Sequence, residues 1–240
     1  MLAASAGLGR GIAAALAREG AKVAMVSRSR DRIEAAANEV GHGSVPLEGD
    51  AADLERMRTL PPEAADRLGG PIEILVLNAG GPPPGTALDN DLEEWQEAFR
   101  SLVLAPRVLA EATVPAMRAA GWGRIVNVGS STLREPIASL TLSNALRQAA
   151  LGFLKTLARE VAGDGVTVNT IATGRFATER LASNWGGWER MEREAAEGVP
   201  AGRLGTPEEY GDLVAFLSSE RAAYLTGTVI PLDGGLLRSI

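Results

Sequence analysis

The 240-residue chain has no cysteine and only one histidine, and these two absences narrow its chemistry. Without cysteine there is no disulfide framework, no thiolate nucleophile and no cysteine metal ligand. Its apolar stretches also stay well short of the roughly 20 residues that span a bilayer. We therefore expect a cytoplasmic protein with no membrane segment and no metal site.

Clusters of positive charge are also missing. The net charge is −6, and the basic residues are scattered along the chain instead of forming a stripe or a patch. Nucleic-acid-binding proteins normally carry such a basic patch, so nucleic acid is not an expected partner.

The Ala-rich residues 1–13 are not expected to be a signal peptide. They lack its basic beginning, and glycines and Arg10 interrupt their apolar run.

Short apolar runs alternate with helical patterns from one end of the chain to the other. Strands are expected at 22–27, 44–48, 72–77, 124–129, 166–172 and 227–232. Helices are expected at 8–19, 30–40, 53–67, 91–119, 142–162 and 206–219. This alternation predicts an α/β fold in which one doubly wound domain, residues 1–240, has a parallel sheet covered by helices on both faces.

A glycine turn, ASAGLG at residues 4–9, should follow a buried first strand, but few residues precede it. We expect a first strand reduced to a stub, or a native start upstream of Met1, with unpaired backbone groups on the neighbouring strands. Gly7 and Gly9 would let the backbone approach a pyrophosphate, towards which the next helix would point its first amides. Taken alone, the turn is as typical of an ordinary glycine-rich helix start as it is of a phosphate-binding site.

Several further motifs, in the same order and spacing, resemble the short-chain dehydrogenase/reductase family along nearly the whole chain. They are LAASAGLG (2–9), LNAGG (77–81), GWGRIVNVGSS (121–131), VTVNTIATG (166–174) and the segment 200–235. The pattern is most similar to the β-ketoacyl carrier-protein reductase branch. The resemblance implies a Rossmann fold, a nicotinamide cofactor, a small-molecule substrate such as an acyl thioester, and a homotetramer.

The resemblance also implies a cofactor site. Its residues would be Ser5, Gly7, Leu8, Gly9, Arg28, Asp50, Asn78, Ala79, Gly80 and Thr178. An acid at the end of the second strand would select NAD, but Ser27 stands there and Arg28 follows, which favours the 2′-phosphate of NADP(H) over NAD. Alternatively, Arg28 is a solvent-exposed residue near the start of the next helix and does not bind the cofactor. Asp50 would contact the adenine, cap the helix at 53–67, or do both.

The family's active site uses asparagine, serine, tyrosine and lysine, and this chain keeps only the serine. Ser130 and Ser143 have the 13-residue separation of the family's serine and tyrosine, so Ser143 stands at the tyrosine position. Arg147 stands at the lysine position and Leu102 at the asparagine position. We expect Ser130, Ser143 and Arg147 to form the catalytic group. Arg147, protonated at any working pH, would stabilise negative charge without donating a proton.

The missing tyrosine leaves three functions open. They are an oxidoreductase with a non-standard active site, a dinucleotide-binding protein without catalysis, and a lyase or isomerase on the same fold. Glu135 is the nearest substitute acid if burial raises its pKa. With Arg134 it would otherwise bind a charged substrate or form a local surface pair. The two tyrosines, Tyr210 and Tyr224, are expected to be structural.

Residues 176–198 fall where the family carries a segment that covers the substrate, so we expect a lid there. Trp185, Trp188 and Met191 would either form its apolar roof or pack a small pair of helices.

Overall fold

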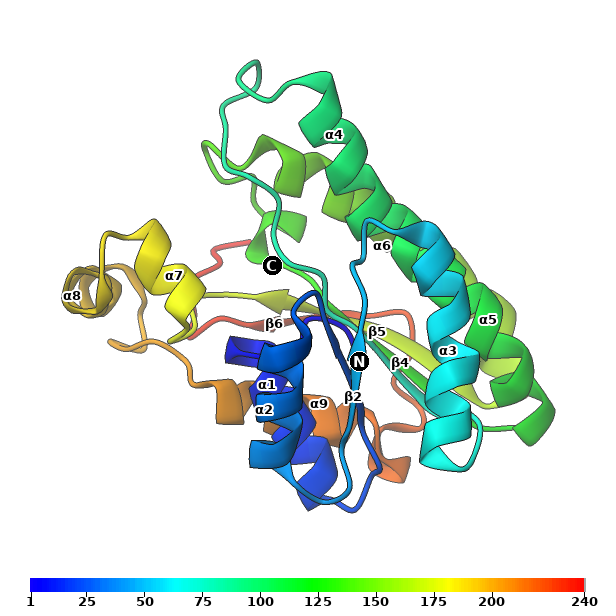
Figure 1. Cartoon of the computed structure of the whole chain (residues 1–240). Helices are drawn as coiled ribbons and strands as arrows, with labels where there is room; N and C mark the ends of the chain where they lie inside the picture. Colours follow the sequence, from blue (N-terminus) through cyan, green and yellow to red (C-terminus); the bar gives the residue numbers. More distant parts are fainter. Residues whose placement is uncertain (240) are drawn as a thin grey trace.

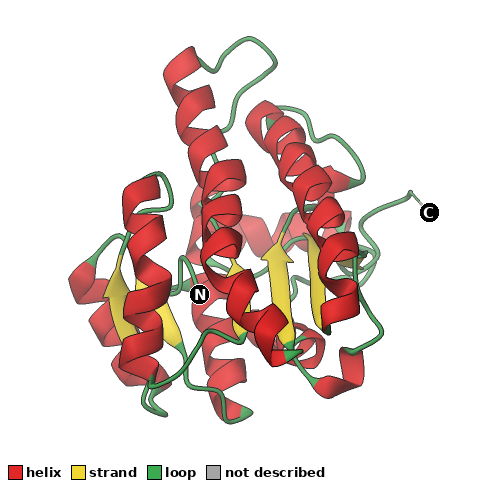
Figure 2. Ribbon diagram, turned by 90° about the vertical axis from the view of Figure 1, so that its right-hand side faces the viewer, coloured by secondary structure: helices red, strands yellow, loops and turns green. Residues whose placement is uncertain are grey.

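In the computed structural model, which describes residues 1–239, a layer of parallel strands lies between two layers of helices (Figures 1 and 2). The strands are β1 (Ala24–Ser27), β2 (Val45–Glu48), β3 (Ile74–Leu77), β4 (Gly123–Val128), β5 (Val166–Thr173) and β6 (Val229–Leu232). β1 pairs with β2, and the other four pair in the order β3–β4–β5–β6, all in parallel. The predicted α/β fold is therefore confirmed.

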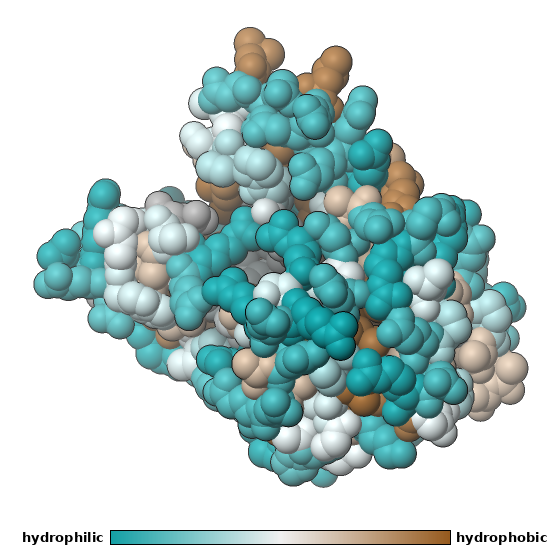
Figure 3. Space-filling view, viewed as in Figure 1, coloured by the Kyte–Doolittle hydropathy of each residue, from teal (hydrophilic) through white to brown (hydrophobic). Residues whose placement is uncertain are grey.

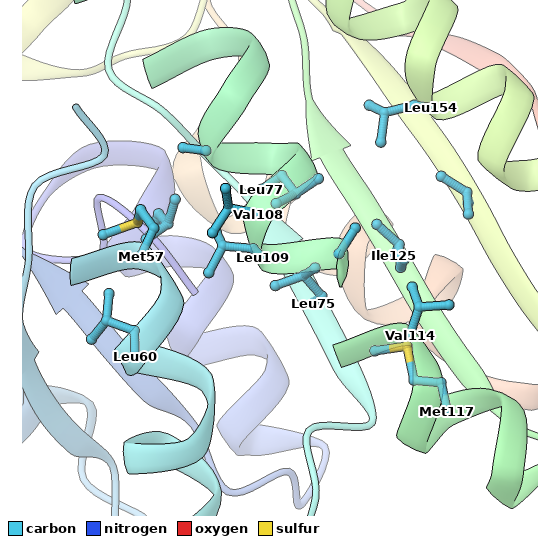
Figure 4. Packing of buried hydrophobic residues seen from close by; sticks show 14 of the residues in the cluster. Met57, Leu60, Leu75, Leu77, Val108, Leu109, Val114, Met117, Ile125 and Leu154 are labelled. Atoms are coloured by element: carbon cyan, nitrogen blue, oxygen red, sulfur yellow. The ribbon is translucent and has the colours of Figure 1, made fainter. Parts of the chain in front are cut away.

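Helices cover both faces of this layer. One face packs against α1 (Gly7–Arg18), α2 (Arg30–Val40) and α9 (Pro207–Leu217). The other packs against α3 (Leu54–Leu68), α5 (Ala105–Ala120) and α6 (Thr141–Val161). In Figure 4, Leu109 of α5 lies beside Leu75 and Leu77 of β3, and Leu60 of α3 belongs to the same cluster. Burial on both faces explains why the strands read as nearly continuous apolar runs.

The helix expected at 91–119 is divided. α4 (Leu92–Phe99) passes through a π-helical turn, Arg100–Leu104, into α5. Pro106 has no N–H to donate, and in a regular helix its ring would meet the carbonyl of the residue four positions earlier. A wider turn just before the proline avoids that clash, which gives a physical reason for the division.

The residues before the glycine turn lie where the first strand is expected. Met1–Ala4 lie between β1 and β3: Val26 N–H donates to the Met1 carbonyl at 2.9 Å, and Leu2 N–H donates to the Val76 carbonyl at 3.5 Å. In Figure 2 the N-terminus accordingly lies between the two groups of strands. A cavity of about 440 Å³ continues the same gap between β1 and β3. The two parts of the sheet are therefore joined by only a few hydrogen bonds.

Apolar side chains also reach the surface around α4. Leu88 and Leu92 are 94% and 79% exposed, and Phe99 is 40% exposed. Brown atoms stand out over this region at the top of Figure 3.

Within residues 1–239, no helix combines the length and the apolar character that crossing a bilayer requires.

Candidate functional site

The loops at the carboxyl ends of the strands border a cleft of about 550 Å³. In open α/β sheets, ligands bind at this edge. The structure gathers many of the predicted cofactor residues in the lining of the cleft, namely Ser5, Arg28, Asp50, Asn78, Ala79 and Gly80. They come from four separate loops, and only the order of the strands brings them together.

The glycine turn lies beside this cleft and opens α1. Gly7 has a φ of 51°, in the left-handed region that favours glycine. A Cβ on Gly9 would lie 1.9 Å from the Ala3 carbonyl oxygen, so only glycine fits there. No side chain caps α1, whose first turn includes Leu8, and its first amides are left available to an anion. Thr178 lies against the turn, with its methyl group 3.2 Å from where a Gly7 Cβ would be.

Ala3 carries backbone strain at the position where the resemblance expects a glycine. Its φ is 48°, which side chains with a Cβ rarely adopt. The Asn78 amide donates to the Ala3 carbonyl at 3.3 Å and so ties the loop after β3 to this stretch.

The adenosine end of the cleft carries cations. Arg28 is exposed on the rim, Arg32 lines the cleft beside it, and neither takes part in an ion pair among the described residues. Arg30, by contrast, is occupied by Glu34, at 2.9 Å. The Ser27 hydroxyl donates to the Ser29 carbonyl at 3.1 Å. An anion at this rim would meet the guanidinium groups of Arg28 and Arg32, which take part in none of the ion pairs of the described residues.

Asp50 does not cap α3, so that part of the expectation is wrong. The cap is Asp53, whose carboxylate accepts from Arg56 N–H at 3.0 Å. Asp50 instead accepts from Ala52 N–H at 2.9 Å, in a tight local turn that keeps its side chain at the cleft.

Ser143 and Arg147 lie one helical turn apart on α6, so their side chains share a face. Arg147 Nε donates to Ser143 Oγ at 3.1 Å, and Arg147 Nη1 donates to the Val128 carbonyl at 3.0 Å. Burial lowers the pKa of Arg147 to about 10, and the charge of Arg180 acts in the same direction. The guanidinium is thus protonated at neutral pH, although it would lose its charge in strongly alkaline solution.

The hydroxyl nearest to Ser143 belongs to Thr132, which the sequence analysis missed. Thr132 Oγ1 and Ser143 Oγ are 3.3 Å apart, and both residues are buried. Ser130 Oγ accepts from Thr132 N–H at 3.2 Å and so caps the short 3₁₀ turn Ser131–Leu133. That turn reverses the chain after β4 and directs Thr132 towards α6. The only sequence signal was a hydroxyl two residues after Ser130.

Leu102, at the asparagine position, is apolar packing. It is 4% exposed and clusters with Leu142 and Leu146 of α6. A cavity of about 10 Å³, near the size of one water molecule, lies beside it and is also bordered by Asn78 and Arg147.

Glu135 is not a substitute acid. Its carboxylate accepts from the backbone N–H groups of Arg238 and Ser239, at 2.8 and 2.6 Å, and these bonds lower its pKa. The expectation of a raised pKa is therefore wrong. Arg134 donates to the Val229 carbonyl at 3.3 Å, so the two residues do not form the local pair considered from the sequence.

The tyrosines do not replace the missing donor either. Tyr210 is fully buried, its hydroxyl lies 2.8 Å from Thr173 Oγ1, and burial raises its pKa. It is structural, as expected. Tyr224 is fully exposed, so it is not packed within this chain.

The segment 176–198 forms α7 (Glu179–Asn184) and α8 (Trp188–Gly198), which project beside the cleft (Figure 1). Met191 is fully buried against Ala182 and Leu204, which favours helix packing over a substrate roof for this residue. The Trp185 ring lies 4.6 Å from the Arg175 guanidinium, and Trp188 is 46% exposed.

Arg180 of α7 is a second residue that the sequence analysis missed. Its Nη2 donates to the Gly81 carbonyl at 2.8 Å, and the side chain lines the cleft.

The chain is similar to known proteins along nearly its whole length. Residues 2–237 match the family model described as enoyl-(acyl carrier protein) reductase. The chain is 34% identical to the 3-oxoacyl-(acyl-carrier-protein) reductase FabG of Vibrio cholerae, over 97% of this chain and 94% of that protein. It is 33% identical to the L-sorbose reductase from Gluconobacter frateurii, solved with NADPH and L-sorbose, with a TM-score of 0.93 covering 100% and 96% of the two chains. YwfH, an NADPH-dependent reductase involved in bacilysin biosynthesis, is 28% identical, with a TM-score of 0.92 over 100% and 97%.

Proposed function

Because the chain belongs to the short-chain dehydrogenase/reductase family of oxidoreductases, we propose that it is an NADP(H)-dependent reductase that works without a tyrosine proton donor. The observation that carries this proposal is the Arg147–Ser143 hydrogen bond of 3.1 Å, at the positions of the family's lysine and tyrosine. A cation and a hydroxyl are thus kept in contact where the family keeps its reacting groups.

The residues of the cleft fit a phosphorylated dinucleotide. The uncapped amides of α1 and the glycine turn would hold the diphosphate, since a Cβ on Gly9 would collide with the backbone there. Arg28, with no carboxylate partner in the described ion pairs, would hold the 2′-phosphate. Asp50 would contact the adenine, and Asn78 to Gly80 would lie along the adenosine ribose. The NADPH-bound and NADPH-dependent relatives support the same cofactor.

When bound, NADPH supplies a hydride. Arg147 would stabilise the negative charge that develops on the substrate oxygen, because it is protonated at neutral pH and is held in place by Val128. Ser143, between Arg147 and Thr132, would donate a hydrogen bond to the same oxygen. The proton itself must then come from water, because no side chain of the site is placed to donate it. Losing a positioned general acid typically lowers the rate by about 10²–10⁴.

We propose small carbonyl compounds as the substrate class, with a 3-oxoacyl thioester as the first to test because of the similarity to FabG. Carbonyl reduction should be slow. A protonated imine should react better, because its nitrogen already carries the proton that a ketone has to acquire.

The serine at the tyrosine position also supports a second candidate, a dinucleotide-binding protein without catalysis. Ser143 is 6% exposed and is already hydrogen-bonded to Arg147 and Thr132, which limits its access to a substrate.

We further propose that residues 1–240 act as one domain, with the lid at 176–198 covering the cleft through α7.

Two steps test the proposal. A fluorescence titration with NADPH and NADH comes first, and NADPH oxidation is then followed with a 3-oxoacyl thioester, a simple ketone and a cyclic imine. Binding of NADPH with slow carbonyl reduction would support the reductase. Binding without turnover of any acceptor would favour the second candidate, and the absence of NADPH binding would contradict both.

A further inference from the structure

Arg180 joins two loops that are far apart in the sequence. It follows Thr178, which lies against Gly7 of the glycine turn, and its guanidinium reaches the carbonyl of Gly81 after β3. Ser5 and Ala6, which lead into the glycine turn, line the same cleft as the Arg180 side chain. The guanidinium thus lines the cleft at Gly81, near the glycine turn.

This position, taken with the proposed function on which the inference rests, suggests a role. We propose that Arg180 binds the diphosphate of the dinucleotide, and that the Gly81 carbonyl is its partner only in the ligand-free protein. Arg180 would then leave the carbonyl for a phosphate oxygen when the cofactor enters.

The electrostatics of the free protein favour such an exchange. None of the ion pairs within residues 1–239 includes Arg180, and burial lowers its pKa. The Arg180 guanidinium donates its hydrogen bond to a neutral carbonyl, that of Gly81, and the like charge of Arg147 is near enough to interact with it. A guanidinium whose hydrogen-bond partner is neutral gains from an anion in its place, because charge-assisted hydrogen bonds are the stronger ones.

The glycine at position 81 supports a resting contact. A Cβ there would lie 2.4 Å from Arg180 Nη2 and 2.9 Å from Cζ, so the guanidinium rests directly on the backbone. Gly81 is not among the described residues with positive φ, so its conformation alone does not require glycine. Gly81→Ala should therefore displace the movable end of Arg180 without straining the loop.

The location separates the diphosphate from the other anions that could bind. A 2′-phosphate is expected at Arg28 and Arg32, which lie on the loop and helix after β1. A substrate is expected at Ser143 and Arg147, which are not among the residues that line this cleft. Arg180 shares its part of the cleft with the glycine turn, which presents the amides of α1.

The test compares two probes on three variants. Arg180→Met keeps the length of the side chain and removes the charge, Arg180→Lys restores a charge, and Gly81→Ala removes the resting contact. The probes are NADPH and 2′-AMP, which has the 2′-phosphate but no phosphate at the 5′ position. Calorimetry gives the Kd of each, and the melting temperature without ligand shows that each variant is folded.

Arg180→Met should weaken NADPH binding by about 10- to 100-fold, as expected for a lost charge-assisted hydrogen bond, and leave 2′-AMP binding unchanged. Arg180→Lys should recover part of the loss, and Gly81→Ala should bind NADPH at least as tightly as the unmodified protein. If a folded Arg180→Met variant bound NADPH normally, or lost both probes equally, the inference would be overturned. Failure of the unmodified protein to bind NADPH would instead overturn the proposed function.

Discussion

Replacing Arg28 by alanine should weaken the binding of NADPH much more than that of NADH. Arg28 lies on the rim of the cleft, and no carboxylate pairs with it among the described ion pairs. Arg30, two residues later, is paired with Glu34. The variant thus removes a cation that is available to the 2′-phosphate, the only group by which the two cofactors differ.

The size of the effect follows from the exposure of Arg28. Hydrogen bonds to charged groups contribute about 1.5–3 kcal/mol, and an exposed, solvent-screened pair belongs at the lower end of that range. About 1.5 kcal/mol corresponds to roughly a tenfold change in Kd. Arg32, which also lines the cleft, would retain part of the phosphate contact and keeps the expected loss near this value.

Fluorescence titration of both cofactors at low and moderate salt measures the effect. NADPH should bind about tenfold more weakly to Arg28→Ala, NADH should be unchanged, and the difference should shrink as salt is added. Arg28→Asp should reverse the preference, since a carboxylate repels the phosphate and accepts from a ribose hydroxyl. Arg30→Ala is the matched control and should resemble the unmodified protein. Equal losses for NADPH and NADH would refute this assignment of Arg28.

Four further predictions follow from the same geometry. Ser143→Tyr combined with Arg147→Lys should raise ketone reduction by about 10²-fold or more, measured as NADPH oxidation in a variant whose cofactor affinity is intact. In the unmodified protein, turnover should fall as the pH rises through about 10, because Arg147 is charged below its pKa and neutral above it; a flat profile to higher pH would contradict the role of its charge. Ala3→Gly should raise the free energy of unfolding by about 0.5–1 kcal/mol in denaturant melts by relieving its φ of 48°, and a loss of stability would disprove the strain. Light scattering should show a homotetramer, since Phe153 and Leu157 on α6 are only partly buried; a monomer at micromolar concentration would contradict this.

The fold could be predicted closely because its signals are local. β4 and β5 are buried on both faces, so their apolar runs marked them to within a residue or two. The π-helical turn before α5 was not predicted, because the proline at 106 indicates a break in the helix but not the wider turn that accommodates it. The missing members of the active-site group could also be named from spacing, as at Leu102.

The rest of the site depends on contacts between distant parts of the chain. Arg180 meets a carbonyl 99 residues away, and no local pattern indicates that partner. Glu135 has its pKa lowered by backbone groups more than 100 residues later, so the sequence suggested the wrong direction. Thr132 becomes a neighbour of Ser143 only because a 3₁₀ turn folds it back from β4 towards α6.

The central claim is that this protein binds NADPH and stabilises a developing oxyanion with Arg147 and Ser143, but has no side chain to protonate it. Its most direct test is the turnover number of the unmodified protein with saturating NADPH at pH 7, for a 3-oxoacyl thioester and for a cyclic imine. Ordinary enzymes turn over about 10 times per second, and a missing general acid lowers that by about 10² or more. The account predicts about 0.1 per second or less for the thioester and a faster rate for the imine. A thioester rate near 10 per second would contradict it, because some group in the site would then be supplying the proton.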